Sequence, residues 1–246
     1  MPRSHVKLRK PQGKTHGPAA REKRAKRDAS GRRLEPDARR TQILEVVEKL
    51  FRKGSYAEIG VADVARAAGI TQGLLYHYYP TKEALFAAAV GRRANDLLLA
   101  CLPDATLPVP EQFERGIKGY LDFVEAHSVL YVNLFRGPAA SETHLMRIAE
   151  QTRHSIIDFI ITSLGLADHA LPATRLSLLG YLGYTETSIL AWLENRSVPR
   201  ATLERLIFAV IIVALRMGLA ADDDMPLSAA QLMELERSYK RHFALP

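Results

Sequence analysis

The sequence lacks most of the residues from which small catalytic and metal sites are built. It contains one cysteine, Cys101, in 246 residues, which excludes a disulfide within the chain and fits a reducing compartment. A single thiolate cannot build a thiolate metal site. The motifs Gly-x-Ser-x-Gly, Gly-x-x-x-x-Gly-Lys and His-Glu-x-x-His do not occur. We therefore expect no enzyme activity, no catalytic residue and no cofactor.

Two further absences argue against a membrane-spanning helix and a metal site. The longest apolar run, from Leu206 to Leu215, is about half of the length that a membrane-spanning helix needs, and no apolar signal segment follows the basic start of the chain. We expect a soluble, cytoplasmic protein without a membrane partner. His144 and His154 are ten residues apart, nearly three helical turns, so they share a helix face only roughly and we expect no metal site.

Positive charge is concentrated at the N-terminus. The net charge is +7, yet residues 1–40 hold 14 Lys/Arg and 4 Asp/Glu, a net +10, which leaves −3 for residues 41–246. Residues 1–34 have almost no large apolar side chains, so we expect a tail that is disordered when free. Such a tail can follow a nucleic-acid backbone or minor groove, or be only a solubilising extension. An anionic membrane surface is less favoured, because no amphipathic helix accompanies the charge.

Beyond the tail, apolar residues recur at helical spacing and no segment shows strand-like alternation, which predicts an all-α fold. Proline and glycine mark most of the breaks, and Thr71 and Thr81 stand where N-caps are needed. Helices are expected over about residues 36–53, 61–68, 72–79, 82–101, 111–126, 128–135, 142–164, 172–194, 200–220 and 228–243.

Residues 61–79 have the layout of a helix-turn-helix. A short apolar helix, a turn at Gly69 and a second helix that begins with small polar residues leave the second helix projecting. Leu75 and Tyr79 are four residues apart and are expected to anchor that helix to the core. Its N-terminal end can then enter a major groove, and the side chains left to face DNA are Gln72, Gly73, Tyr76, His77 and Tyr78.

This part of the chain resembles the TetR family of regulators over about residues 38–90. Residues 68–86, with the run Tyr-His-Tyr-Tyr-Pro-Thr-Lys at 76–82, carry the resemblance most clearly, and residues 40–56 match the start of the family pattern. The DNA contacts that the resemblance implies are Thr71, Gln72 and Gly73 at base edges, Tyr76, His77 and Tyr78 at phosphates or bases, Lys82 at a phosphate, and Arg40 near the start of the match.

One departure from the family pattern stands at Ile59 and Gly60, where two hydroxyl residues usually open the second helix. A side-chain cap and a phosphate contact are therefore missing there. Glycine still caps through its backbone, at a loss of a few tenths of a kcal/mol. We expect some backbone affinity to come from elsewhere, with the basic tail as the candidate.

The later part of the chain has longer and more apolar helices. The helix over residues 200–220 contains a run at 206–215 that is apolar on every side, so this helix is either fully buried or shared with a partner chain. Proteins of the resembled family use this region to dimerise and to enclose a ligand. The candidate pocket residues, for which ordinary core packing is the alternative, are Phe113, Tyr120, Phe123, Tyr131, Leu134, Phe135, Phe159, Tyr184 and Trp192.

The sequence therefore predicts a tail (1–34), a helix-turn-helix domain (35–82) and a helical ligand-binding and dimerisation domain (83–246). We expect a homodimeric repressor that binds operator DNA and is released by a hydrophobic effector. An acyl chain or acyl-CoA, another lipid, a hydrophobic drug and a steroid-like metabolite remain open as effectors. The alternative is a helical dimeric interaction protein whose DNA-binding motif is vestigial.

Overall fold

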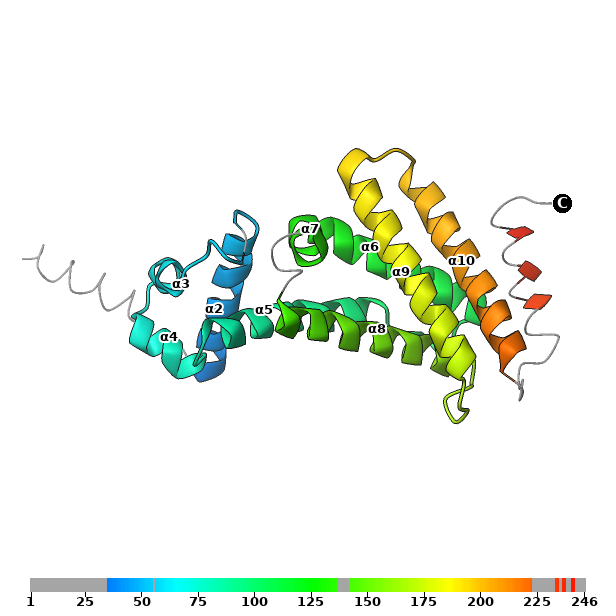
Figure 1. Ribbon diagram of the computed structural model, residues 1–246, viewed down its shortest axis with the longest axis horizontal. Helices are drawn as coiled ribbons and strands as arrows, with labels where there is room; N and C mark the ends of the chain where they lie inside the picture. Colours follow the sequence, from blue (N-terminus) through cyan, green and yellow to red (C-terminus); the bar gives the residue numbers. More distant parts are fainter. Residues whose placement is uncertain are drawn as a thin grey trace, which may run out of the picture. The chain divides into compact units, whose positions relative to one another are not determined.

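The computed structural model describes residues 35–54, 56–136 and 142–222, together with residues 233–234, 236–237 and 240–241. Within these residues the regular elements are helices and no strand occurs (Figure 1), which confirms the all-α prediction. Two predictions lie largely or wholly outside the described residues: the disordered tail over 1–34 and the helix over 228–243. Backbone contacts divide the chain into residues 1–41 and 42–246.

The first helices begin and end where local signals place them. Helix α2 (Pro36–Phe51) is followed by α3 (Val61–Ala68), α4 (Gln72–Tyr78) and α5 (Lys82–Ala100). Gly69 adopts a φ of 66°, a left-handed conformation that terminates helices and favours glycine. The hydroxyl oxygens of Thr71 and Thr81 accept hydrogen bonds from the third residue after each, so both are N-caps as the sequence predicts.

Helices α6 (Val109–Ala126), α7 (Ser128–Arg136) and α8 (Thr143–Ser163) follow. Helix α6 begins two residues before the predicted start, because Pro108 stands at its N-cap and Pro110 lies in its first turn. Proline is tolerated in a first turn, whose N–H groups have no partner within the helix. The predicted break after α7 falls on residues 137–141, which are not described.

Helices α9 (Pro172–Asn195) and α10 (Arg200–Ala221) lie side by side and run in opposite directions (Figure 1). Gly218 lets them approach closely, since a Cβ atom there would lie 2.4 Å from the Cα of Thr174. At the same end, the carboxylate of Asp222 accepts hydrogen bonds from the backbone of Ala173 and Thr174 and from the Thr174 hydroxyl, at 2.7–3.0 Å. Asp222 therefore caps α9 from the end of α10.

The sequence left open whether the helix over residues 200–220 is fully buried or shared with a partner chain, and α10 is not fully buried. One face is buried, with Ile207, Ile211 and Leu215 at most 2 % exposed, whereas Val213 and Met217 on the opposite side are 52 % and 65 % exposed. The helix is therefore a core element on one side only.

Two clusters of buried apolar side chains lie within residues 42–246. One joins α2, α3, α4 and the first half of α5 and includes Leu145 from α8. The other joins α6 to α10 with Leu97 near the end of α5. Helix α5 therefore contributes to both clusters, and this continuity places the helix-turn-helix and the larger bundle on one common element.

Candidate functional site

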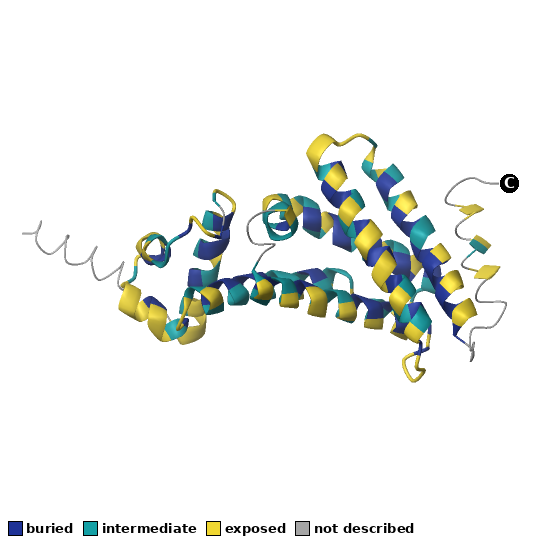
Figure 2. Ribbon diagram, viewed as in Figure 1, coloured by how far each residue is buried: buried dark blue, intermediate teal, exposed yellow. Residues whose placement is uncertain are grey.

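Helix α4 presents one buried side and one exposed side. Leu75 and Tyr79 are 1 % and 9 % exposed, which confirms that they anchor the helix in the core. Figure 2 shows that most of the remaining surface of α4 is exposed. Gln72, Gly73 and His77 are exposed and Tyr76 is 44 % exposed, while Tyr78 is half-buried. The outward side chains are those that a groove-binding helix needs.

The N-terminus of α3 shows what the Ile59–Gly60 departure does to the backbone. Gly60 has extended dihedral angles and makes no side-chain cap. The carboxylate of Asp63 instead accepts a hydrogen bond from the Gly60 N–H at 3.3 Å. This is one of the two hydrogen bonds of a capping box. The other, in which an N-cap hydroxyl oxygen accepts from a backbone N–H, is absent because Gly60 has no side chain.

Two other candidate DNA contacts have partners within the protein. The Lys82 ammonium donates to the carbonyl of Ala57 at 3.4 Å and lies 4.6 Å from the centre of the Tyr56 ring, a distance suited to a cation–π contact. Lys82 therefore also supports the turn before α3. Arg40 is exposed and pairs with Asp37 at 3.1 Å within residues 1–41.

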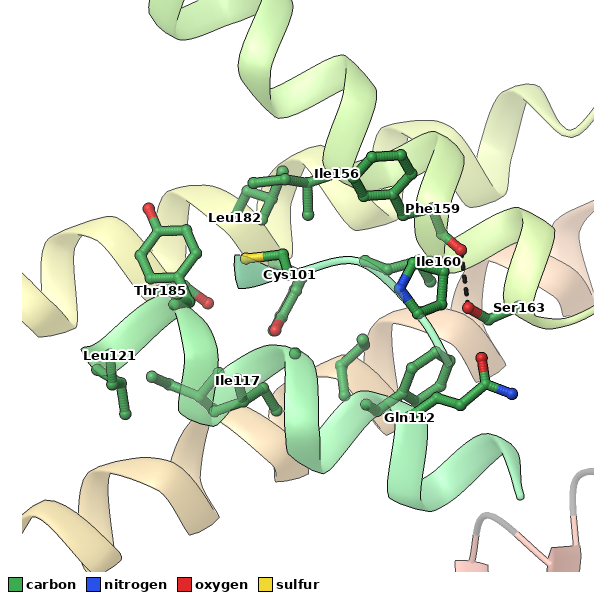
Figure 3. A pocket seen from close by; sticks show the side chains of 17 residues that line it. Cys101, Gln112, Ile117, Leu121, Ile156, Phe159, Ile160, Ser163, Leu182 and Thr185 are labelled. Carbon is green, nitrogen blue, oxygen red and sulfur yellow. Dashed lines mark hydrogen bonds between the residues drawn. The ribbon is translucent and has the colours of Figure 1, made fainter. Parts of the chain in front are cut away.

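The larger bundle contains a partly open cavity of about 60 Å³, called cavity A. Figure 3 shows side chains of α6 and α8 facing it from opposite sides, with Cys101 between them. Burial raises the pKa of the Cys101 thiol to about 12, so the thiol is protonated and is not a nucleophile. None of the lining residues is charged. They are Cys101, Pro103, Gln112, Phe113, Gly116, Ile117, Tyr120, Leu121, Ile156, Phe159, Ile160, Ser163, Tyr181, Leu182, Thr185, Ile207 and Ile211.

A second, partly open cavity of about 60 Å³, called cavity B, lies beside α5. Tyr120, Ile156 and Leu182 line both cavities, so they form the wall between A and B. The hydroxyl groups of Tyr120 and Tyr131 are 3.0 Å apart and bonded to each other. The further lining residues of cavity B are Val90, Arg93, Ala94, Leu97, Phe123, His127, Leu130, Tyr131, Leu134, Phe135, Ile148, Ala149, Thr152, Arg153 and Glu186.

Two family models match the chain. "Bacterial regulatory proteins, tetR family" covers residues 43–89, and "Tetracyclin repressor-like, C-terminal domain" covers residues 109–214. The chain belongs to the TetR family of transcriptional regulators. The two matched segments correspond to the helix-turn-helix with the first part of α5, and to the bundle that holds the cavities.

Individual relatives agree with this assignment of the TetR-family chain. It is 25% identical over 171 residues to the transcriptional activator FasR of Mycolicibacterium smegmatis, which covers 67% of this chain and 77% of that protein. A TetR-family regulator from Streptomyces coelicolor has a solved structure with a TM-score of 0.66 and 28% identity, covering 86% of this chain and 90% of that one. FadR from Bacillus subtilis, solved with stearoyl-CoA, has a TM-score of 0.55 and 15% identity over 71% of this chain and 97% of that one, which shows the fold alone.

Seven of the nine predicted pocket residues of this TetR-family protein line a cavity: Phe113 and Phe159 in A, Tyr120 in both, and Phe123, Tyr131, Leu134 and Phe135 in B. Tyr184 and Trp192 line neither. Tyr184 is 37 % exposed on the outer face of α9. The Trp192 indole donates to the carbonyl of Val198 at 2.8 Å, and the Arg196 guanidinium lies 3.7 Å from its ring centre, so Trp192 fastens the α9–α10 turn.

Cavity B also holds charged groups that the sequence did not indicate. Arg153 on α8 donates two hydrogen bonds to Glu186 on α9, at 2.7 and 2.8 Å. Arg93 on α5 donates to Glu48 on α2 and, at 2.7 Å, to Asp96. Burial lowers the pKa of the Arg93 guanidinium, but the hydrogen bond and charge of Glu48, followed by those of Asp96, raise it above its ordinary value. Arg153 and Glu186 are 33 residues apart and Arg93 and Glu48 are 45 apart, so no local pattern reveals these two pairs.

Two further features were sought in the described part of the chain, a metal site and a membrane-spanning helix. It contains no cluster of three or more His, Cys, Asp or Glu side chains placed to hold a metal ion. None of its helices combines the length and the apolar character needed to cross a bilayer.

Proposed function

We propose that this TetR-family regulator is a homodimeric repressor that binds operator DNA through α4 and releases it when a hydrophobic effector fills the cavities. The observation that carries this proposal is the position of α5. This helix packs against the core that anchors α4 and also lines cavity B through Val90, Arg93, Ala94 and Leu97. A ligand that displaces α5 changes the spacing of the two recognition helices of a dimer, which must match two half-sites.

The DNA-contacting residues of the proposal are those on the exposed side of α4 and at its ends. Thr71, Gln72 and Gly73 approach base edges, and Tyr76, His77 and Tyr78 contact phosphates or bases. Lys82 and Arg40 add phosphate contacts. For Lys82 this contact competes with the Ala57 carbonyl or adds to it, because an ammonium has three donors.

The dimer interface of the proposal is the outer face of α9 and α10. Between residues 176 and 191 the exposed residues of α9 recur at helical spacing and are uncharged: Leu176, Leu179, Gly180, Gly183, Tyr184, Thr187 and Ala191. The charged Glu194 is exposed only at the end of the helix. A Cβ atom at Gly180 or Gly183 would meet nothing within 4 Å, so a second helix has room to approach the backbone. An exposed apolar stripe of this kind is typical of a surface that a second copy covers.

The effector of the proposal is apolar, because the cavities are lined mainly by aliphatic and aromatic side chains. An acyl chain, alone or as an acyl-CoA, fits this lining. The stearoyl-CoA in the FadR structure belongs to that protein, and it supports the choice of acyl compounds as the first class to test.

The decisive experiment selects binding sites from random DNA with the purified full-length chain and then measures affinity by fluorescence anisotropy. We expect an inverted repeat, two chains per site and release by an acyl compound. Native mass spectrometry of the same preparation identifies any ligand that co-purifies. Enrichment of no sequence would contradict operator binding and favour the interaction-protein alternative, whereas tighter DNA binding with ligand would contradict release by the effector.

A further inference from the structure

Arg93 lies where cavity B meets the helix-turn-helix. Its side chain is 20 % exposed and lines cavity B from α5, while one end of its guanidinium donates to Glu48, whose side chain is 8 % exposed, on α2. The other end donates to Asp96 at 2.7 Å. A single guanidinium therefore touches the wall of the cavity and the helix that carries the core of the DNA-binding region.

The hydrogen bonds at this junction are incomplete. Among the described residues, five buried side-chain polar atoms have no hydrogen-bond partner, and three of them are here: the Arg93 Nε, the Arg92 Nη1 and the Glu48 Oε1. Buried donors without acceptors are costly, so a native structure that keeps them together calls for a reason. The Nε–H of Arg93 is a buried donor for which a further acceptor is missing.

The other guanidinium of cavity B is already satisfied. Arg153 uses both its Nε and its Nη2 to bind the two carboxylate oxygens of Glu186, which is the bidentate arrangement in which arginine binds a carboxylate most strongly. Cavity A offers no charged lining residue. Arg93 is thus the group in the two cavities that is best placed to accept a new anionic partner.

A thin wall separates cavity B from Glu48. Val90 and Leu130 line cavity B and also line a small void of about 10 Å³ that Glu48 and Phe51 border from α2. Helix α7 is tied to the same helix, because the Asn133 side chain donates to the Phe51 carbonyl at 3.1 Å. A ligand in cavity B therefore lies next to both attachments of α2.

We propose that cavity B binds an amphiphile with a carboxylate head, and that this carboxylate replaces Glu48 as the hydrogen-bond partner of Arg93. The inference rests on the proposed function and names the chemical class of its effector. The apolar lining takes the chain of the amphiphile, and the guanidinium takes its head.

Because the ligand carboxylate and Glu48 compete for Arg93, the ligand should weaken DNA binding. Glu48 and Asp96 already surround this guanidinium, so a third carboxylate is repelled unless Glu48 leaves. A buried Glu48 without its arginine is unfavourable, and it regains solvation only if α2 and α5 move apart. Binding of the acid therefore weakens the attachment of α2 to α5. By thermodynamic linkage, operator DNA lowers the affinity for the acid by the same factor by which the acid lowers the affinity for DNA.

The test compares two probes with the same chain, dodecanoic acid and dodecyl alcohol, by isothermal titration calorimetry on the full-length protein. We expect the acid to bind at least about tenfold more tightly than the alcohol, because only the acid makes a charge-assisted pair with Arg93. Glu48→Gln removes the competing charge, so the acid should bind about tenfold more tightly still while the affinity for the alcohol stays unchanged. Arg93→Gln should abolish the preference for the acid.

Two controls keep the test decisive. If Arg93→Gln alone fails to fold, the double variant Glu48→Gln/Arg93→Gln leaves no lone buried charge and must bind acid and alcohol equally. Arg92→Gln, next to Arg93 but outside the cavity lining, must keep the preference. Equal affinity of the wild type for the two probes, no binding of the acid, or loss of the preference in Arg153→Gln but not in Arg93→Gln would overturn the inference. Failure to bind any operator would overturn the proposed function instead, since the calorimetry needs no DNA.

Discussion

The exposed side of α4 and cavity B differ in how far along the chain their residues are spread. The candidate DNA contacts of α4 lie within residues 71–78, and the Thr71 cap and the Leu75 anchor fix their orientation locally. Cavity B takes its lining from α5, α6, α7, α8 and α9. A surface built from one short helix can be predicted from its own residues. A cavity built from five helices depends on packing, and so does the ligand chemistry that it offers.

We expect the largest effect on the buried side of α10, where the packing of distant helices determines which residues are buried. Ile211→Asp places a charge among buried side chains and should lower the free energy of unfolding by about 3 kcal/mol or more. Val213→Asp, two residues away on the exposed side, should produce monomers and should lower the melting temperature only by the stabilisation that the partner subunit gives. Thermal unfolding by circular dichroism and sedimentation velocity measure the two effects. A folded, monomeric Ile211→Asp variant would place the interface on the opposite face.

The second-largest effect is expected on the exposed side of α4. Gln72→Ala should cost about 1–3 kcal/mol at one base position, because a glutamine amide can bond an adenine edge with two hydrogen bonds. Stability and ligand binding should not change. Competition anisotropy with single-base operator variants measures the loss. Lys82→Ala is the matched control: it should weaken all sequences alike and reduce the salt-dependence slope by about one unit. Equal weakening of specific and random DNA by Gln72→Ala would remove Gln72 from the base contacts.

The third prediction concerns the basic N-terminal segment, which lies outside the described residues. Deleting residues 1–33 should weaken operator affinity at least about tenfold, or about 1.4 kcal/mol, and should flatten the salt dependence, since each phosphate neutralised contributes about 0.9 to the slope. The dimer and the response to ligand should be kept. Loss confined to sites with A·T-rich flanks would indicate a minor-groove contact. Identical titration curves at low salt for the two proteins would show a passive extension.

The smallest effect is expected at Asp222, where the end of α10 caps α9. The hydrogen bond from the Thr174 hydroxyl, with the backbone N–H groups of Thr174 and Ala173, lowers the pKa of Asp222 in the folded protein. Its contribution to stability is therefore complete above the unfolded value of about 3.9 and is lost as the pH falls through the lower folded value. Asp222→Asn should melt slightly earlier at neutral pH, and the difference should shrink below about pH 4. A difference that does not change with pH would show that the charge of Asp222 is not involved.

Local signals were enough to predict the helices and the exposed side of α4. Threonine caps, a glycine in the left-handed region and prolines in first turns act within a few residues, so they can be recognised without the fold. Seven of nine pocket candidates line a cavity because large apolar residues on amphipathic helices generally point inward. The prediction for Tyr184 was wrong because the apolar residues of α9 are spread around the whole helix, so its sequence does not distinguish the face toward α10 from the face toward solvent.

By itself, the sequence determined an all-α chain with a capped, glycine-turned helix-turn-helix, because each of these features depends on residues close together along the backbone. Only the tertiary structure decided which face of α10 is core, that Trp192 fastens a turn and does not line a cavity, and that Arg93 joins cavity B to Glu48. Those outcomes bring together residues that are far apart in the chain, such as Glu48 and Arg93. Their pairing follows from how the helices pack, which no local pattern of residues encodes.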